Sequence, residues 1–282
     1  MRKKKAIVQW SMIFMMLIGA GAILYPLGAN IYERYTQQRV VSSFRKQVSE
    51  NGRQQIEREK KIKKYNQDVA KRTRPEISDP FVTHSDVHDG AYDLYESLLG
   101  KIVGTIRIPK IDVELPIYFG TNKHQLDKGA GVIPGTSLPV GGLGTHSVIT
   151  AHRGLQKARM FTDLPELKIG DNFFIDQSSG ILAYKINQIV TILPNDSRQI
   201  QIVPGKDYVT LLTCTPLGEN THRLLVRGER IPYQKKQEKV NTQDKRAQMG
   251  RQYRPLFIVL GIVFLFFLIN LIQKWWCKRN LA

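Results

Sequence analysis

Two long apolar runs, one near each end of the chain, set the strongest limit on how this sequence folds. The first spans residues 6–31, behind the basic stretch 1–5, and the second spans residues 255–272. Each run is long enough to cross a bilayer core of about 30 Å as a helix. We therefore expect two transmembrane helices, with one folded region of the chain between them.

Basic residues stand outside both predicted spans, in residues 1–5 and in the tail 273–282. Because positive charge is retained on the cytoplasmic side, we expect both termini in the cytoplasm and the middle of the chain outside the cell. Two other interpretations stay open. The first run could be a cleaved signal peptide, since residues 19–22 resemble a processing site, and the second could be a buried core helix.

The formal net charge of +18 could suggest nucleic-acid binding. A domain exported between two spans does not meet nucleic acid, so anionic lipids and anionic wall polymers are the expected counter-charges. The alternative is that much of the charge belongs to solvated helix faces and to the membrane anchors.

The chain has only two cysteines, Cys214 and Cys277. Cys277 follows the second predicted span, on the cytoplasmic side, so the two cannot pair. A free thiol outside the cell is exposed to oxidation unless chemistry requires it. This usage points to Cys214 as a nucleophile.

The composition and hydrophobic pattern change several times along the region between the spans. Its predicted parts are a helical stalk at 32–72, a loop at 73–90, a β-rich domain at 91–233 and a basic linker at 234–254. In the stalk, apolar residues recur at helical spacing, and Asn51-Gly52 is the natural break between two amphipathic helices. We expect the stalk to pack one face against the domain.

The domain is mainly β, with short helices near 92–99 and 158–164. Seven or eight strands are predicted, seven of them at 103–108, 111–118, 147–151, 172–176, 182–193, 208–213 and 223–230. Turns rich in Gly and Pro, such as 132–144, separate the strands. This pattern favours a closed or nearly closed barrel.

Three reactive side chains lie at the predicted strand ends: His152, Cys214 and Arg223. A cysteine attacks a carbonyl as the thiolate, so it needs a neighbouring base or cation, and a histidine can also protonate the departing amine. A guanidinium can stabilise the oxyanion that acyl transfer creates. The three residues together predict nucleophilic acyl transfer.

Each assignment has a competitor. Cys214 could be an inert core residue, and His146 and His222 lie near the same strands as His152. Arg227 lies four residues after Arg223 and so points to the same face of its strand, which leaves the choice of arginine open. The Cys and His residues lack metal-ligand spacing, so no metal site is predicted.

Three motifs in this order resemble the sortases, and in particular the pilin-polymerising class C: Thr-Ala-His-Arg-Gly, Thr-Leu-Leu-Thr-Cys-Thr-Pro and Asn-Thr-His-Arg-Leu-Leu-Val-Arg-Gly. The resemblance runs from about residue 79 to residue 230. It implies a closed eight-stranded sortase-type barrel with His152, Cys214 and Arg223 as the catalytic set, and so selects Arg223 over Arg227.

The resemblance extends to Asp79, Pro80 and Phe81, which are similar to the lid motif of class C enzymes. It implies that the aspartate faces the catalytic arginine and the aromatic ring covers the cysteine. The site would then rest closed until substrate displaces the lid.

By resemblance, the expected function is cleavage of an LPXTG-like sorting signal on a pilin subunit, through a thioacyl-enzyme at Cys214. A lysine of another pilin would accept the acyl group, which builds a covalent pilus on a Gram-positive surface without a cofactor. The expected partners are pilins and the membrane. A wall-anchoring sortase that uses a peptidoglycan amine, and a non-catalytic scaffold that binds wall polymers, are the alternatives.

Overall fold

The computed structural model describes residues 2–50, 52–71, 81, 101–238 and 250, and part of the stretch 254–269. Tyr32–Asn241 form one compact unit, and Met1–Ile31 with Thr242–Ala282 form another. The predicted helix at 92–99 and most of the predicted lid loop lie outside the described residues.

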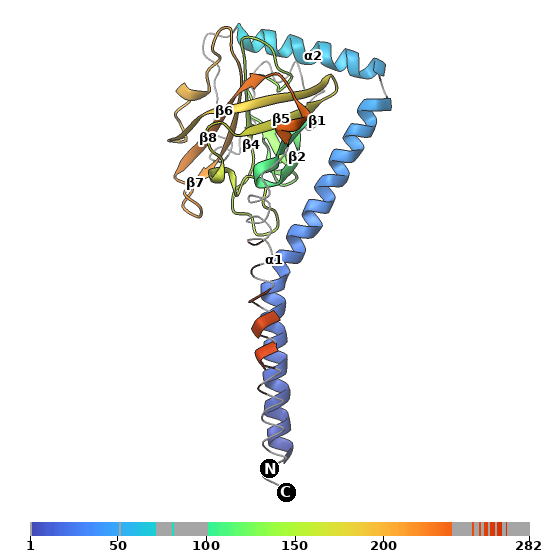
Figure 1. Cartoon of the computed structure of the whole chain (residues 1–282), viewed down its shortest axis with the longest axis vertical. Helices are drawn as coiled ribbons and strands as arrows, with labels where there is room; N and C mark the ends of the chain where they lie inside the picture. The colour runs from blue at the N-terminus through green and yellow to red at the C-terminus, as the bar shows by residue number, and fades with distance from the viewer. Residues whose placement is uncertain are drawn as a thin grey trace. The chain divides into compact units, whose positions relative to one another are not determined.

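Eight strands of the described region close into a barrel in the order β1-β2-β3-β4-β7-β8-β6-β5 (Figure 1). They are β1 (Ile102–Ile108), β2 (Val113–Phe119), β3 (Ala130–Val132), β4 (Thr145–Thr150), β5 (Asn172–Gln177), β6 (Gly180–Ile192), β7 (Asp207–Thr215) and β8 (His222–Ile231). Neighbours are antiparallel except for β2 with β3 and β4 with β7, which are parallel. The mainly β fold and the closed eight-stranded barrel are confirmed.

Large apolar side chains fill the barrel, because alternate residues of each strand point inward. The rings of Phe173 on β5 and Tyr184 on β6 stack with their centroids 5.4 Å apart. Gly228 on β8 lies against them, since a Cβ there would come within 2.5 Å of the Phe173 ring. This packing holds β8, the strand that contains Arg223, in a fixed register against β6.

The structure contains all seven strands predicted above, and an eighth strand, β3, whose position the sequence did not indicate. It has three residues, and its Gly131 packs so closely that a Cβ would meet the Gly120 carbonyl at 2.3 Å. A short helix, α4 (Lys123–Leu126), was also not predicted. Asn122 and Gln125 cap it reciprocally.

The helix predicted at 158–164 is wrong. Met160 has a φ of 40°, a left-handed conformation that interrupts a right-handed helix. The chain forms turns here, followed by a short 3-10 helix, η3 (Leu164–Glu166). The predicted linker at 234–254 also begins with structure, the 3-10 helix η5 (Lys235–Glu238).

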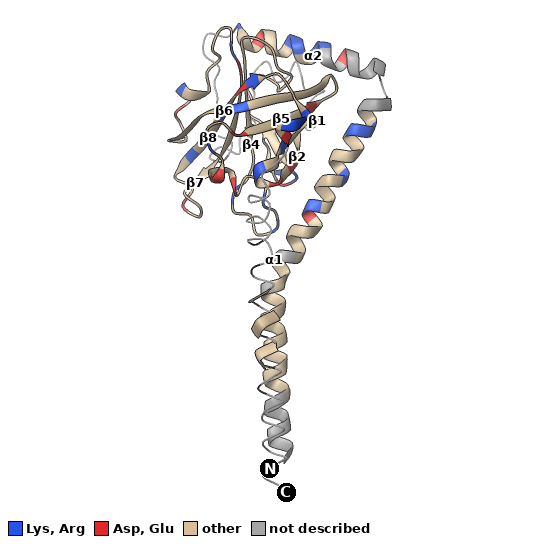
Figure 2. Cartoon of the chain, viewed as in Figure 1, with Lys and Arg blue, Asp and Glu red and all other residues tan. Residues whose placement is uncertain are grey.

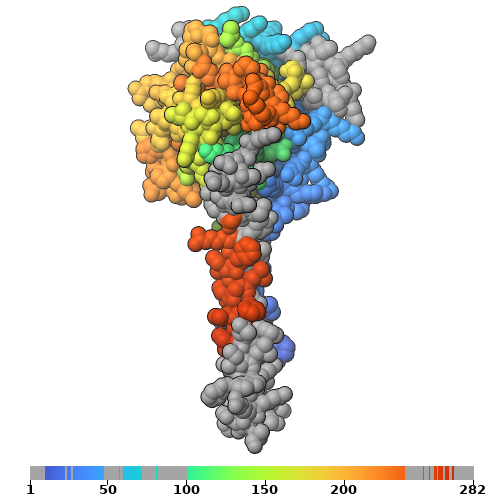
Figure 3. Space-filling view, in the orientation of Figure 1, coloured from blue at the N-terminus to red at the C-terminus, as the bar shows by residue number. Residues whose placement is uncertain are grey.

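The two predicted stalk helices are present, with the break where it was expected: α1 (Arg2–Glu50) ends before Asn51, and α2 (Gly52–Ala70) follows. Helix α2 lies along the top of the barrel (Figure 3), and Tyr65, on its buried face, meets the Phe119 ring edge-on at 5.4 Å. Asn66 holds the backbone of Leu138 through two hydrogen bonds, of 2.7 and 3.0 Å. The stalk therefore packs on the barrel through one face, as predicted.

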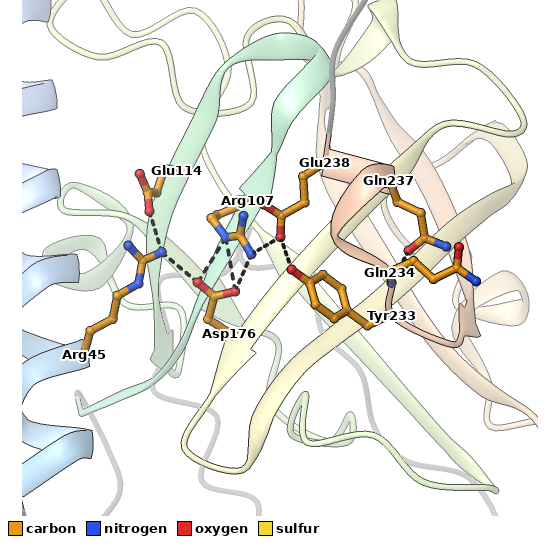
Figure 4. Close-up of polar contacts among 8 residues, drawn as sticks. All are labelled: Arg45, Arg107, Glu114, Asp176, Tyr233, Gln234, Gln237 and Glu238. Carbon is orange, nitrogen blue, oxygen red and sulfur yellow. Dashed lines mark hydrogen bonds and ion pairs between the residues drawn. The ribbon is translucent and has the colours of Figure 1, made fainter.

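A chain of charged groups ties α1 to the barrel surface (Figure 4). Arg45 on α1 donates to Glu114 on β2 and to Asp176 on β5, each at 2.7 Å. Asp176 also accepts from Arg107 on β1, and Arg107 reaches Glu238 of η5 at 3.0 Å. The network joins the helix that enters the unit to the segment that leaves it.

Among the described residues, one helix is long and apolar enough to cross a membrane, at Trp10–Gln47. Figure 2 shows no blue or red in the apolar part of this helix, which agrees with the first predicted span. The second predicted span, 255–272, lies mostly outside the described residues. Those of its residues that are described are helical.

Candidate active site

The β7–β8 hairpin brings Cys214 and Arg223 together. They are direct partners in its antiparallel register, near the end of β7 and the start of β8. Directly opposed residues point to the same face of a sheet, with Cβ atoms about 5 Å apart. Cys214 is 8% exposed and Arg223 2% exposed, so the hairpin places a buried thiol beside a buried guanidinium.

Backbone carbonyls orient Arg223. Its guanidinium donates to the carbonyl oxygens of Asn220, at 2.8 Å, and His222, at 2.9 Å. Asn220 has a φ of 57°, which turns its carbonyl within the tight connection between the strands. The guanidinium is thus fixed by the turn that precedes it.

Arg227, the other candidate, is elsewhere on β8. It is paired with Thr210, donates to Asn187 at 3.1 Å, and lies over the Tyr208 ring at 4.4 Å. Four residues of strand separate it from Arg223, a distance of about 13 Å. The structure therefore places Arg223, and not Arg227, beside Cys214.

The parallel pairing of β4 and β7 brings His152 to the same end of the barrel. The register ends with Thr150 opposite Leu212, and His152 and Cys214 each follow two residues later. The seam continues past this pair, since Ala151 donates its N–H to Leu212 and accepts from the Thr213 hydroxyl at 2.9 Å. Residues far apart in the sequence therefore meet at one site.

The His152 ring is half-buried, and this burial lowers its pKa below the ordinary value. Asp127, just after α4, opposes the shift, while Lys123 and Lys157 add to it. The pKa of Asp127 is itself lowered, chiefly by its hydrogen bond from Lys123. The lowered pKa favours the neutral imidazole, which can accept a proton.

The other two candidate histidines do not share this setting. His146, at the opposite end of β4, is 1% exposed, and its ring nitrogens lie 2.7 Å from the Gln201 carbonyl and 2.8 Å from the Thr210 hydroxyl. Burial lowers its pKa to about 4. His222 bonds to the adjacent Thr221 hydroxyl at 2.9 Å. Of the three, His146 is a core residue.

Phe81 lies against two residues of the site. Its ring lies 5.5 Å from the His152 ring, and the Arg223 guanidinium stands over it at 5.4 Å. It packs on a small apolar cluster, which comprises Ile133, Val148, Ile192, Ile200, Leu212 and Leu225. Asp79 and Pro80, the other predicted lid residues, lie outside the described residues.

Sequence reasoning missed one further residue at this site. Arg153 bonds to the backbone oxygen of Cys214 and to the Thr215 hydroxyl. Its place directly after His152 is the signal that the sequence offers, but its partners, Cys214 and Thr215, lie 61 and 62 residues further along the chain.

Comparison with known proteins agrees with this geometry. A family model described as a sortase domain matches residues 106–231. The crystal structure of sortase C1 from Streptococcus agalactiae is similar with a TM-score of 0.62 and 40% identity, over 68% of this chain and 97% of that one. Sortase C from Streptococcus pneumoniae, described as informative on pilin substrate specificity, has a TM-score of 0.61 and 43% identity, over 69% of this chain and 97% of that one.

Among curated sequences, sortase A of Streptococcus agalactiae serotype III is 30% identical over 132 residues, which cover 45% of this chain and 52% of the relative. The chain spans about half the length of the curated relatives it matches.

Proposed function

The chain belongs to the sortase family of cysteine transpeptidases, and we propose that it is a pilin polymerase of class C. Its substrates would be pilin subunits with an LPXTG-like sorting signal. Its product would be an isopeptide bond between the threonine of one subunit and a lysine of another.

In the first half-reaction, His152 takes the thiol proton and the Cys214 sulfur attacks the Thr–Gly carbonyl carbon. A C–S bond forms, and negative charge gathers on the carbonyl oxygen, where Arg223 can stabilise it. The C–N bond then breaks, His152 gives its proton to the departing amine, and a thioester remains on Cys214.

In the second half-reaction, a lysine amine attacks the thioester carbon. The amine loses a proton to His152, a C–N bond forms and the C–S bond breaks, and His152 then passes the proton to the departing sulfur, which returns the thiol. The lowered pKa of His152 supports this role, because a neutral imidazole can accept a proton in both halves.

The observation that carries the pilin assignment is the position of Phe81 over Arg223 and His152. We propose that this ring obstructs the approach of an acyl group to the site, so that Phe81 serves as a lid residue. The similarity to sortase C structures supports the same assignment. A wall-anchoring sortase shares the triad but has no need of this cover, and a non-catalytic scaffold has no need of the gathered site.

The test compares two acceptors. The chain with Phe81→Ala is given a sorting-signal peptide together with equal amounts of a lysine-bearing pilin peptide and a peptidoglycan stem peptide. We expect mass spectrometry to find mainly the lysine-linked product. Exclusive transfer to the wall amine would assign the chain to wall anchoring instead.

We propose further that both ends of the chain are membrane spans with cytoplasmic termini, which places the barrel outside the cell. The apolar helix near the N-terminus supports the first span. In intact cells that express the Phe81→Ala chain, a membrane-impermeant thiol reagent should label Cys214 and leave Cys277 unlabelled. Labelling of Cys277 would overturn this topology.

A further inference from the structure

The backbone seam that joins the His152 strand to the Cys214 strand ends in a side-chain contact. Arg153 donates from one guanidinium nitrogen to the carbonyl oxygen of Cys214, at 3.2 Å, and to the Thr215 hydroxyl, at 2.9 Å. Arg153 is half-buried and directly follows His152. One residue therefore connects the segment of the histidine to the nucleophile.

This contact lies where the next backbone hydrogen bond between β4 and β7 would be. In the parallel pair, the N–H of Ala151 donates to the carbonyl of Leu212. Backbone groups two residues apart point to the same side of a strand. If β4 continued past its end, the next donor would be the N–H of residue 153, and the next acceptor would be the carbonyl of Cys214. Instead, the guanidinium of Arg153 meets this carbonyl.

The backbone of this segment turns away because it is held elsewhere. The carbonyl of His152 accepts the N–H of Phe161 at 3.0 Å, and the N–H of Gly154 donates to the Thr162 hydroxyl at 3.0 Å. The turn presents the His152 ring to the site, and the Arg153 side chain reaches the Cys214 carbonyl from the same segment.

We propose that Arg153 is a positioning residue that fixes the Cys214 backbone relative to His152. Its guanidinium does not contact the reacting atoms; it sets the separation of the sulfur and the imidazole, and its charge lies beside the residue that becomes a thiolate. This role rests on the proposed acyl transfer at Cys214. It adds a fourth residue to the three taken from the family motifs.

The test uses the full chain in detergent micelles with Phe81→Ala, so that the site is open. Arg153→Met removes the donors and the charge at similar length, and Arg153→Lys keeps a charged donor. Arg159→Met is the matched control, because Arg159 lies on the same loop but its side chain pairs with Asp163 at the exposed surface.

Three quantities are measured: kcat and KM for cleavage of a sorting-signal peptide, the pH dependence of Cys214 alkylation by iodoacetamide, and the thermal midpoint. Alkylation is followed on the Cys214 peptide by mass spectrometry, so Cys277 does not contribute. It also needs no substrate.

We expect Arg153→Met to lower kcat by about 10- to 100-fold with little change in KM, as a small misplacement of reacting groups does. The alkylation profile should move to higher pH, since the thiolate loses a nearby cation and its aligned imidazole. Arg153→Lys should recover most of the rate, and Arg159→Met should match the parent.

An unchanged kcat, or a lower kcat with an unmoved alkylation profile and a lower thermal midpoint, would overturn the proposal and leave Arg153 a structural residue. A parent that cleaves no peptide would count against the proposed function. In that case the alkylation profile alone would still decide whether Arg153 positions Cys214.

Discussion

Cys214 and Arg223 meet because they are opposite partners in one hairpin, so the geometry of thiol and guanidinium is set by backbone register. The Arg223 guanidinium cannot move far, because it donates to the carbonyls of Asn220 and His222. At the scale of single residues, the site is therefore rigid where charge would develop in the reaction.

Substitution of each arginine tests which of the two, Arg223 or Arg227, takes part in the reaction. Arg223→Lys should lower kcat for peptide cleavage by about 100-fold or more, because an ammonium lacks the fork that holds the guanidinium in place. Arg227→Lys, on the same strand but beside Tyr208, should stay within about 3-fold of the parent. Equal losses in the two variants would contradict the assignment of Arg223.

His146 gives the barrel a defined sensitivity to acid. Its pKa is about 4 in the folded chain and about 6.5 when unfolded, so between these values the unfolded state binds the extra proton. Stability therefore falls as the pH drops below about 6.5, and at pH 5 the loss from this residue is about 2 kcal/mol.

The measurement is the free energy of unfolding in urea at pH 7 and pH 5, for the parent and for His146→Gln. The glutamine can still bond to the Gln201 carbonyl but does not titrate. The parent should lose about 2 kcal/mol more than the variant between the two pH values. An equal pH dependence would show that His146 does not carry the effect.

Some of these residue-level findings could be predicted and some could not. The strand-end positions of His152, Cys214 and Arg223 were visible in the sequence, but strand period could not choose between Arg223 and Arg227, because both point to one face. The pairing register of β7 with β8 decides which arginine lies beside Cys214, and this register is set by the tertiary structure. Arg153 was missed for the same reason, since its partner is 61 residues away.

At the scale of elements, the proposed lid role of Phe81 can be tested through the reactivity of the Cys214 thiol. Phe81→Ala should raise the rate of Cys214 alkylation by about 10-fold or more while leaving the thermal midpoint nearly unchanged, because only a half-buried ring is lost from a small cluster. Leu217→Ala, at an exposed position of the β7–β8 turn, is the control. If Phe81→Ala leaves the alkylation rate of Cys214 unchanged, Phe81 does not act as a lid residue.

The charged network drawn in Figure 4 should contribute to the free energy of unfolding, and its members should contribute unequally. Arg45→Met should cost less than about 1 kcal/mol of unfolding free energy, since the Arg45 side chain is 47% exposed. Asp176→Asn should cost about 2 kcal/mol, because it also weakens the pairing of Arg107, whose side chain is 18% exposed. Urea unfolding of both variants checks the order, and an equal cost would contradict it.

Long, strongly patterned elements were predictable from sequence, such as the stalk helices and the seven longer strands. Short ones were not: β3 has three residues and α4 has four, too few to show a period. The predicted helix at 158–164 failed because the left-handed Met160 is imposed by packing and not by local preference.

At the scale of the whole molecule, the barrel and its stalk form one unit, Tyr32–Asn241, and the chain leaves this unit at both ends toward apolar sequence. A domain tethered at both ends would stay at the membrane while successive pilins reach its site. This agrees with repeated rounds of transfer, which polymerisation needs.

A polymerisation assay tests whether the chain joins pilins through Cys214. The Phe81→Ala chain, with and without Cys214→Ala, is incubated with a pilin that carries its sorting signal, and the products are resolved on a denaturing gel and by mass spectrometry. We expect a ladder of lysine-linked pilin multimers that requires Cys214. Cleaved monomers without multimers, or a ladder that persists in Cys214→Ala, would contradict it.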